Sequence, residues 1–129
     1  MTNLAGCRVL VVEDEILIAL MVQTMLSDLG GEVMAVVHTP AEALSFIRAN
    51  AGRLDAVTLD LNLGGESAQR VATELAMNGI PFVVITGYGD ACVLAPFQDR
   101  PVLAKPFLAE QLAQAFRSLH LAKTSLSGA

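Results

Sequence analysis

The sequence is poor in cysteine, in basic residues and in long apolar runs, and each shortage excludes a class of protein. Its two cysteines, Cys7 and Cys92, stand in no metal-binding spacing, so we expect reduced thiols. The 8 Lys and Arg residues against 13 Asp and Glu residues give a net charge of −5, which disfavours direct binding to nucleic acid. No apolar run approaches the ~20 residues that a bilayer requires. Because the N-terminus also lacks the pattern of a secretory signal, we expect a cytoplasmic protein without membrane insertion.

What the sequence has in quantity is apolar residues, which make up 53% of its 129 residues, whereas charged residues make up 16%. This balance favours one globular domain with a sizeable core and excludes a multidomain enzyme. We expect a single domain over residues 1–129, with a core of about residues 7–122 and a tail over 123–129.

Short β-branched and apolar runs alternate with helical patterns along the chain. The runs predict five strands, at Arg8–Val12, Glu32–Val37, Asp55–Leu61, Ile80–Thr86 and Pro101–Ala104. Helical spacing predicts four helices between and after them, at 16–29, 40–50, 67–77 and 108–119, with a glycine-bearing loop over 63–66. Between Gly87 and Arg100, glycines and Pro96 interrupt the pattern, so a short or irregular fourth helix is expected there. The alternation predicts an α/β fold with a parallel sheet, whose chemistry lies at the carboxyl ends of the strands.

Five polar side chains stand at those carboxyl ends. They are Glu13 and Asp14 after the first strand, Asp60 at the end of the third, Thr86 after the fourth and Lys105 after the fifth. Carboxylates brought this close repel one another unless a cation lies among them. Mg²⁺ suits such a site, because it binds one or two carboxylates together with waters and phosphoryl oxygens.

Four motifs carry a family resemblance, each at a strand end: VLVVEDE, DAVTLDLNLGGE, PFVVITGYGD and PVLAKPF. In this order they resemble the receiver domains of two-component response regulators, over residues 8 to about 120. The resemblance implies a flavodoxin-like (βα)5 three-layer sandwich with a five-stranded parallel sheet of order 2-1-3-4-5.

The resemblance also implies a role for each residue. Asp60 would be the phosphoacceptor, attacking the phosphohistidine of a sensor histidine kinase or of a histidine phosphotransfer protein. Mg²⁺ would be held by Glu13, Asp14, Asp60 and the backbone carbonyl of Asn62. Thr86 and Lys105 would neutralise the phosphoryl oxygens. Such a protein is no conventional enzyme, although it carries out its own Mg²⁺-dependent phosphorylation and autodephosphorylation.

Three further positions follow from the same resemblance. Asn62, Tyr88 and Pro106 are expected to tune the lifetime of the phosphoryl group. The family implies a cis peptide bond before Pro106, whereas trans is the usual form before proline. His38 and His120 are expected away from the acidic rim, as solvated or capping residues.

One position departs from the family pattern. Many receivers carry an aromatic switch residue three positions before the lysine, where this chain has Val102. Together with ITGYGD, this departure resembles an alphaproteobacterial subgroup of receivers whose partners are kinases of the HWE and related types. How activation is relayed past Val102 stays open.

Other functions fit these residues less well. A phosphatase of the haloacid dehalogenase type would need an acid two residues after Asp60, where Asn62 stands. A flavin or dinucleotide module would need GxGxxG, but the sixth position from Gly87 is Cys92. The remaining alternative is a pseudo-receiver that binds proteins without being phosphorylated. Because the sequence ends soon after the last predicted helix, we expect a stand-alone receiver that signals to a downstream protein through a changed binding face.

Overall fold

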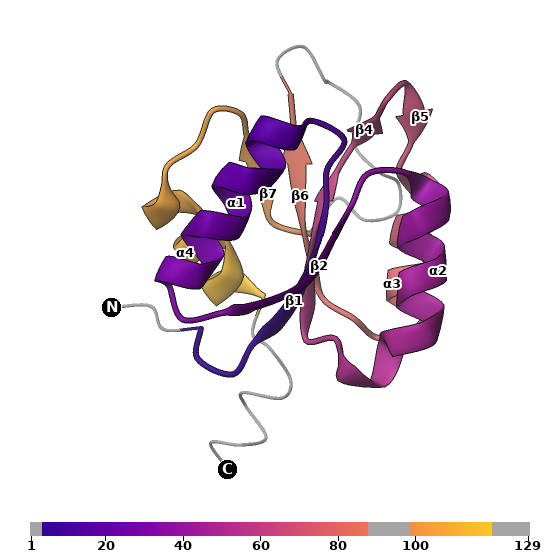
Figure 1. Ribbon diagram of the computed structural model, residues 1–129, viewed down its shortest axis with the longest axis horizontal. Helices are drawn as coiled ribbons and strands as arrows, with labels where there is room; N and C mark the ends of the chain where they lie inside the picture. Colours follow the sequence, from indigo (N-terminus) through magenta and orange to yellow (C-terminus); the bar gives the residue numbers. More distant parts are fainter. Residues whose placement is uncertain (1–3, 88–98, 120–129) are drawn as a thin grey trace.

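A five-stranded parallel sheet forms the centre of the computed structural model, which describes residues 4–87 and 99–119 (Figure 1). Its strands are β1 (Arg8–Val12), β2 (Glu32–Val37), β3 (Ala56–Asp60), β6 (Phe82–Thr86) and β7 (Val102–Ala104). The order across the sheet is β2-β1-β3-β6-β7. This order confirms the predicted flavodoxin-like arrangement, since β6 and β7 are the fourth and fifth strands of the sheet in chain order.

Helices cover both faces of the sheet. They are α1 (Ile16–Asp28), α2 (Pro40–Asn50), α3 (Gln69–Met77) and α4 (Ala109–Ser118), with a short 3-10 turn η1 (Ala51–Arg53). Figure 1 shows α1 and α4 on one face and α2 and α3 on the other. Thr39 caps α2, because its Oγ1 accepts from Glu42 N at 3.1 Å, and Glu42 Oε1 accepts from the N–H of His38, the residue before the cap, at 2.8 Å. Most of the interval predicted to hold a short or irregular helix, 87–100, lies outside the described residues.

The alternation of side chains along each strand builds two separate apolar cores. On the face of α2 and α3, Leu10 and Val12 of β1 pack with Phe82 and Val84 of β6. On the face of α1 and α4, Val9 and Val11 pack with Val83 and Ile85, and with Phe116 of α4. Because both faces are covered, the polar ends of the strands are the part of the sheet left for chemistry.

The loop predicted after the third strand is more ordered than expected. It forms a small antiparallel hairpin of β4 (Asn62–Leu63) and β5 (Glu66–Ser67), and α3 therefore begins at Gln69 rather than at Ser67. Gly64 and Gly65 make the turn with φ values of +62° and +90°, a conformation that glycine adopts at little cost. The hairpin stands at the carboxyl-end edge of the sheet (Figure 1).

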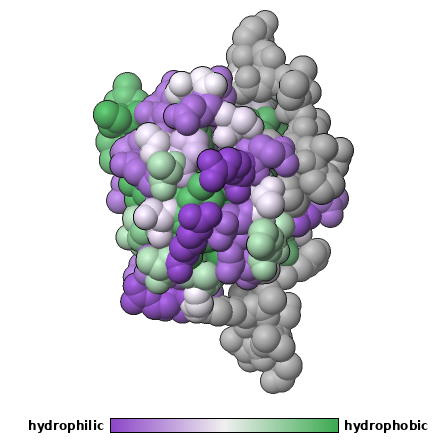
Figure 2. Space-filling model, turned by 90° about the vertical axis from the view of Figure 1, so that its right-hand side faces the viewer, coloured by the Kyte–Doolittle hydropathy of each residue, from purple (hydrophilic) through white to green (hydrophobic). Residues whose placement is uncertain are grey.

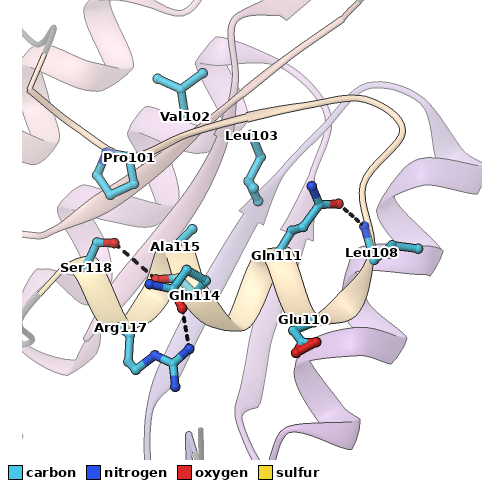
Figure 3. Close-up of a pocket in the computed structure, with 10 residues that line it drawn as sticks. All are labelled: Pro101, Val102, Leu103, Leu108, Glu110, Gln111, Gln114, Ala115, Arg117 and Ser118. Carbon is cyan, nitrogen blue, oxygen red and sulfur yellow. Dashed lines mark hydrogen bonds between the residues drawn. The ribbon is translucent and has the colours of Figure 1, made fainter.

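The molecular surface differs from face to face. Figure 2 shows the side of α2 and α3, which is mostly hydrophilic. Beside the edge strand β7, a groove of about 680 Å³ runs between β7 and α4, with Val102 and Leu108 exposed along it (Figure 3).

Among the described residues, no helix is long and apolar enough to cross a bilayer.

Candidate functional site

The carboxyl ends of β1, β3 and β7 meet around a cavity of about 220 Å³. Parallel strands end at the same edge of a sheet, so loops far apart in the sequence contribute to one wall. The residues that line the cavity are Asp14, Glu15, Asp60, Asn62, Gly64, Gly65, Gly87 and Lys105. Most of these residues are polar or charged, and the four side chains of full charge come from three different loops.

Asp60 is the last residue of β3, and its side chain is only 3% exposed. Every residue of β3 is buried, so the strand delivers this carboxylate to a protected position. Its Oδ1 accepts from the backbone N–H of Asn62 at 3.1 Å, and its Oδ2 accepts from Lys105 Nζ at 3.1 Å. The carboxylate is thus held in one orientation at the cavity wall.

Lys105 reaches the cavity from the loop after β7. Its backbone N–H donates to Thr86 O at 2.8 Å, and the buried Phe107 anchors the loop in the core beneath α1 and α4. The peptide bond between Lys105 and Pro106 is cis, as the resemblance implied. Nζ donates to three carboxylates, those of Glu13 at 3.1 Å, Glu15 at 2.9 Å and Asp60 at 3.1 Å.

Burial by itself lowers the pKa of Lys105, because it disfavours the charged form. Hydrogen bonds to Glu15 and Glu13 and the charges of Asp60 and Glu13 outweigh burial, so the pKa lies above the usual value for lysine. The ammonium therefore stays charged at neutral pH.

Glu13 is the most enclosed acid of the site, with 1% of its surface exposed. Burial, then a hydrogen bond with Asp60 and the charge of Asp60, raise its pKa to about 8, although Lys105 opposes the shift. Its Oε2 contacts Lys105, whereas its Oε1 is buried and has no hydrogen-bond partner among residues 4–87 and 99–119. An unpartnered buried carboxylate oxygen is costly unless a cation or a proton meets it.

Asp14 lines the cavity and contacts the β4–β5 hairpin. Its Oδ2 accepts from the backbone N–H of Gly64 at 2.9 Å, a contact across 50 residues of sequence. The next amide, Gly65 N–H, donates to the side chain of Asn62 at 2.8 Å. The hairpin therefore fixes both Asp14 and Asn62 at the rim.

The donor set fits a hard divalent cation. Carboxylate oxygens of Glu13, Asp14, Glu15 and Asp60 all lie within 4.8 Å of one another. Oxygen ligands of this kind suit Mg²⁺. Among the described residues Glu13 Oε1 has no hydrogen-bond partner, so this oxygen is available to bind the ion. A cation among these oxygens would also favour the charged form of Glu13.

The structure brings together most of the residues that the sequence singled out. Glu13, Asp14, Asp60, Asn62 and Lys105 all lie at this rim. Thr86 ends β6 half-buried, and among the described residues its side chain does not line the cavity, although its carbonyl positions Lys105. Pro106 is exposed beside Lys105, whereas Tyr88 and His120 lie outside the described residues.

Two contacts at the rim escaped the sequence analysis. Glu15, which directly follows Asp14, binds Lys105, and its place in the run of three acids could have indicated this. His38 is exposed and does not line the cavity, as expected, but its Nδ1–H donates to the backbone carbonyl of Glu13 at 2.9 Å, a contact that the sequence did not predict. That contact depends on how the ends of β1 and β2 are paired, and no sequence pattern indicates it.

Comparison with known proteins agrees with this geometry. The family model for the response regulator receiver domain matches residues 9–117. The solution structure of SdrG from Sphingomonas melonis Fr1 is 44% identical, covers 88% of this chain and 95% of that chain, and superposes with a TM-score of 0.80. The BeF3-activated conformation of SdrG from Pseudomonas melonis Fr1 is also 44% identical, covering 89% of this chain and 97% of that chain with a TM-score of 0.74.

A longer protein also contains this fold. The response regulator PhyR from Brucella abortus is 28% identical with a TM-score of 0.76, and the match covers 98% of this chain but 52% of that chain. The search of curated proteins gives no match. From the sheet order, the acidic rim and the family match over 9–117, the chain belongs to the response regulator receiver domains of two-component signalling.

Proposed function

We propose that this receiver accepts a phosphoryl group on Asp60, in a Mg²⁺-dependent reaction, and signals through a changed protein-binding face. The donor is the phosphohistidine of a sensor histidine kinase or of a histidine phosphotransfer protein. The observation that carries the proposal is the position of Asp60, whose Oδ2 lies 3.1 Å from the Lys105 ammonium inside an acidic cavity. Phosphoryl transfer needs a nucleophile, a positively charged group beside it and acidic residues that can bind a metal ion. Asp60, Lys105 and the acidic cavity provide these at one edge of the sheet.

The reaction that these residues support is a direct transfer. An oxygen of Asp60 attacks the phosphorus, an O–P bond forms, and the P–N bond of the phosphohistidine breaks with its electron pair going to the imidazole nitrogen. Lys105 holds the attacking carboxylate and places positive charge beside the transferred group. The backbone N–H of Asn62 orients the other oxygen of Asp60.

The acidic rim would hold the metal ion. Asp14, Glu13 and Asp60 offer the carboxylate oxygens, with the backbone carbonyl of Asn62 as a further ligand. When bound, Mg²⁺ supplies positive charge that neutralises the oxygens of the phosphoryl group. Phosphorylated Asp60 would then carry new acceptor oxygens, toward which the Thr86 hydroxyl and Lys105 can turn.

Helix α1 offers the surface on which the phosphodonor protein would dock. Its first turns expose three large apolar residues, Ile16, Leu17 and Leu20, which are 73%, 80% and 56% exposed. They follow directly after Glu15, which lines the cavity, so a protein bound to them stands beside Asp60. Apolar side chains gathered next to a reaction site are typical of a protein-binding surface. By contrast, the side of α2 and α3 is mostly hydrophilic (Figure 2).

The similarity to SdrG and PhyR supports membership of the alphaproteobacterial subgroup with kinases of the HWE and related types. A cytoplasmic location is part of the same proposal. One of the SdrG structures is described as BeF3-activated. We therefore expect BeF3⁻, which resembles a phosphoryl group in charge and shape, to bind this receiver at Asp60.

The test uses a small donor, so that no cognate kinase is needed. Incubation with phosphoramidate, which carries a P–N bond, and Mg²⁺ should add one phosphoryl group to the wild type, measured by mass spectrometry of the intact chain. Asp60→Asn should add none. Asp28→Asn, which removes an exposed acid at the end of α1, should behave as the wild type. Equal labelling of Asp60→Asn and the wild type would remove Asp60 from its role, and no labelling of either would favour an unphosphorylated interaction module.

A further inference from the structure

Among the three described residues whose side chains bind Lys105, Glu15 is the exposed one. The side chains of Glu13 and Asp60 are 1% and 3% exposed, whereas that of Glu15 is 60% exposed. Its Oε1 lies 2.9 Å from Lys105 Nζ, the shortest of the three contacts. A carboxylate this exposed exchanges its partner for water at little cost, while a buried one does not.

The ammonium of Lys105 has no hydrogen bond to spare. It carries three N–H donors, and each has a carboxyl oxygen of Glu13, Glu15 or Asp60 as its acceptor. A phosphoryl oxygen on Asp60 therefore has to take the place of one acceptor. Glu13 is enclosed and Asp60 carries the new group, so the bond to Glu15 is the one that can be released.

We propose that Glu15 is a positioning residue that holds the Lys105 ammonium while Asp60 is unmodified and competes with the phosphoryl group for it. The inference rests on the proposed function and adds a regulatory role at the same site. Glu15 would lower the affinity for a phosphoryl group and favour its loss. A receiver without this carboxylate would stay phosphorylated for longer.

Glu15 also affects the two ligands of the site in opposite directions. Its negative charge attracts Mg²⁺ and repels an anionic phosphoryl group, and its hydrogen bond withholds Lys105 from that group. Removing the carboxylate should therefore strengthen binding of a phosphoryl analogue without strengthening binding of Mg²⁺. A residue that only supported the local structure would weaken both ligands when substituted.

Substitution of Glu15 should leave the fold intact. Glu15 is the N-cap of α1, but its side chain makes no capping hydrogen bond. Glu15→Gln keeps the length of the side chain and removes its charge, and Glu15→Ala removes both. Glu110→Gln is the matched control, because it removes one exposed acid beside the β7–α4 groove, away from the cavity (Figure 3).

The experiment titrates the full chain with BeF3⁻ at saturating Mg²⁺, and separately with Mg²⁺ alone, following backbone amides by NMR. In both Glu15 variants the affinity for BeF3⁻ should rise about two- to five-fold, the range for loss of one exposed ion pair. Their affinity for Mg²⁺ should be equal to that of the wild type or lower. The resonance of the Lys105 ammonium should shift in Glu15→Gln and not in Glu110→Gln.

The outcomes separate this inference from the proposed function. A wild type that binds BeF3⁻, with Glu15 variants that bind it equally or more weakly, overturns the role of Glu15 alone. The same holds if Glu110→Gln tightens BeF3⁻ binding as much, because net charge would then account for the effect. A wild type that does not bind BeF3⁻ at all overturns both proposals.

Discussion

At the scale of single residues, Gly64 shows how a backbone conformation supports the chemistry. Its φ of +62° is a left-handed conformation, and its N–H donates to Asp14 at 2.9 Å. An added Cβ would lie 3.8 Å from Asp14 Oδ2, which is an ordinary contact. Space is therefore available, and the need for glycine comes from the backbone angle rather than from crowding.

We predict that Gly64→Ala lowers the free energy of unfolding by about 1 kcal/mol, because an L-residue is strained at this φ. Gly52→Ala is the control, since Gly52 lies in η1 with a negative or extended φ and no atom within 4 Å of its added Cβ. That variant should be as stable as the wild type or slightly more stable. Urea unfolding measures both, and equal losses in the two variants would contradict the explanation.

The residue scale also shows what the sequence could and could not reveal. Asp60 and Lys105 were predictable, because Asp60 ends one recognisable apolar strand, Lys105 directly follows another, and the carboxyl ends of parallel strands converge. The run of three acids could have indicated Glu15, but the contact of His38 could not be predicted, because it depends on a side-chain rotamer and on loop geometry across 25 residues of sequence. The periodicity of apolar residues predicts which face of a helix or strand a residue occupies, but not which side chain it contacts.

At the scale of elements, α1 combines two functions on two faces. Ala19, Val22 and Leu26 are buried against the sheet, whereas Ile16, Leu17 and Leu20 are exposed beside the cavity. A helix that is apolar on its outer face as well does not have the polar surface expected in contact with water. The outer face is therefore explained by a bound protein better than by the stability of the receiver itself.

We predict that Leu17→Ser slows phosphoryl transfer from a protein donor by about three- to ten-fold, because part of a leucine's burial is lost from the docked complex. The rate of labelling by phosphoramidate should not change, since that donor needs no docking surface. Met77→Ser, which removes an equally exposed apolar side chain from α3, should leave both rates unchanged. Slower labelling of Leu17→Ser by both donors would point to a damaged site instead of a lost docking contact.

Elements differ in how well the sequence defines them. The bounds of β1, β2 and α2 agree with the prediction, because apolar, β-branched runs define the two strands and the Thr39 cap followed by Pro40 defines the start of the helix. The β4–β5 hairpin was predicted as a plain loop, since its strands are two residues long and show no periodicity. It owes its order to Gly64, Gly65 and the contact with Asp14, which only the folded chain provides.

At the scale of the whole molecule, the fold concentrates charge that the sequence spreads out. Four of the 13 acidic residues bring carboxylate oxygens within 4.8 Å of one another at one edge of the sheet, and Lys105 is the one described base that binds among them. Bringing like charges together destabilises the folded state relative to the unfolded chain, where they are far apart. The repulsion at this edge lowers the free energy of unfolding, and a cation bound there should restore part of it.

The sheet order supports the same conclusion. Because β1 and β3 are neighbours in the sheet, their carboxyl ends lie side by side, and Asp14 and Asp60 bring carboxylate oxygens within 4.8 Å of each other. The prediction of order 2-1-3-4-5 came from the family resemblance, since periodicity alone cannot order parallel strands. The strand order thus brings the acidic residues together, and their charges repel one another in the metal-free protein.

We therefore predict that Mg²⁺ raises the thermal unfolding midpoint in a concentration-dependent way, by preferential binding to the folded state. At ten times the dissociation constant the gain in stability is about 1.4 kcal/mol, which corresponds to a few degrees for a domain of this size. Calorimetry with and without a chelator, at matched ionic strength, measures the shift. Asp14→Asn should abolish most of it, whereas Asp28→Asn, an exposed acid at the far end of α1, should retain it. If Asp14→Asn and the wild type shifted equally, the ion would be stabilising the chain somewhere other than the acidic rim.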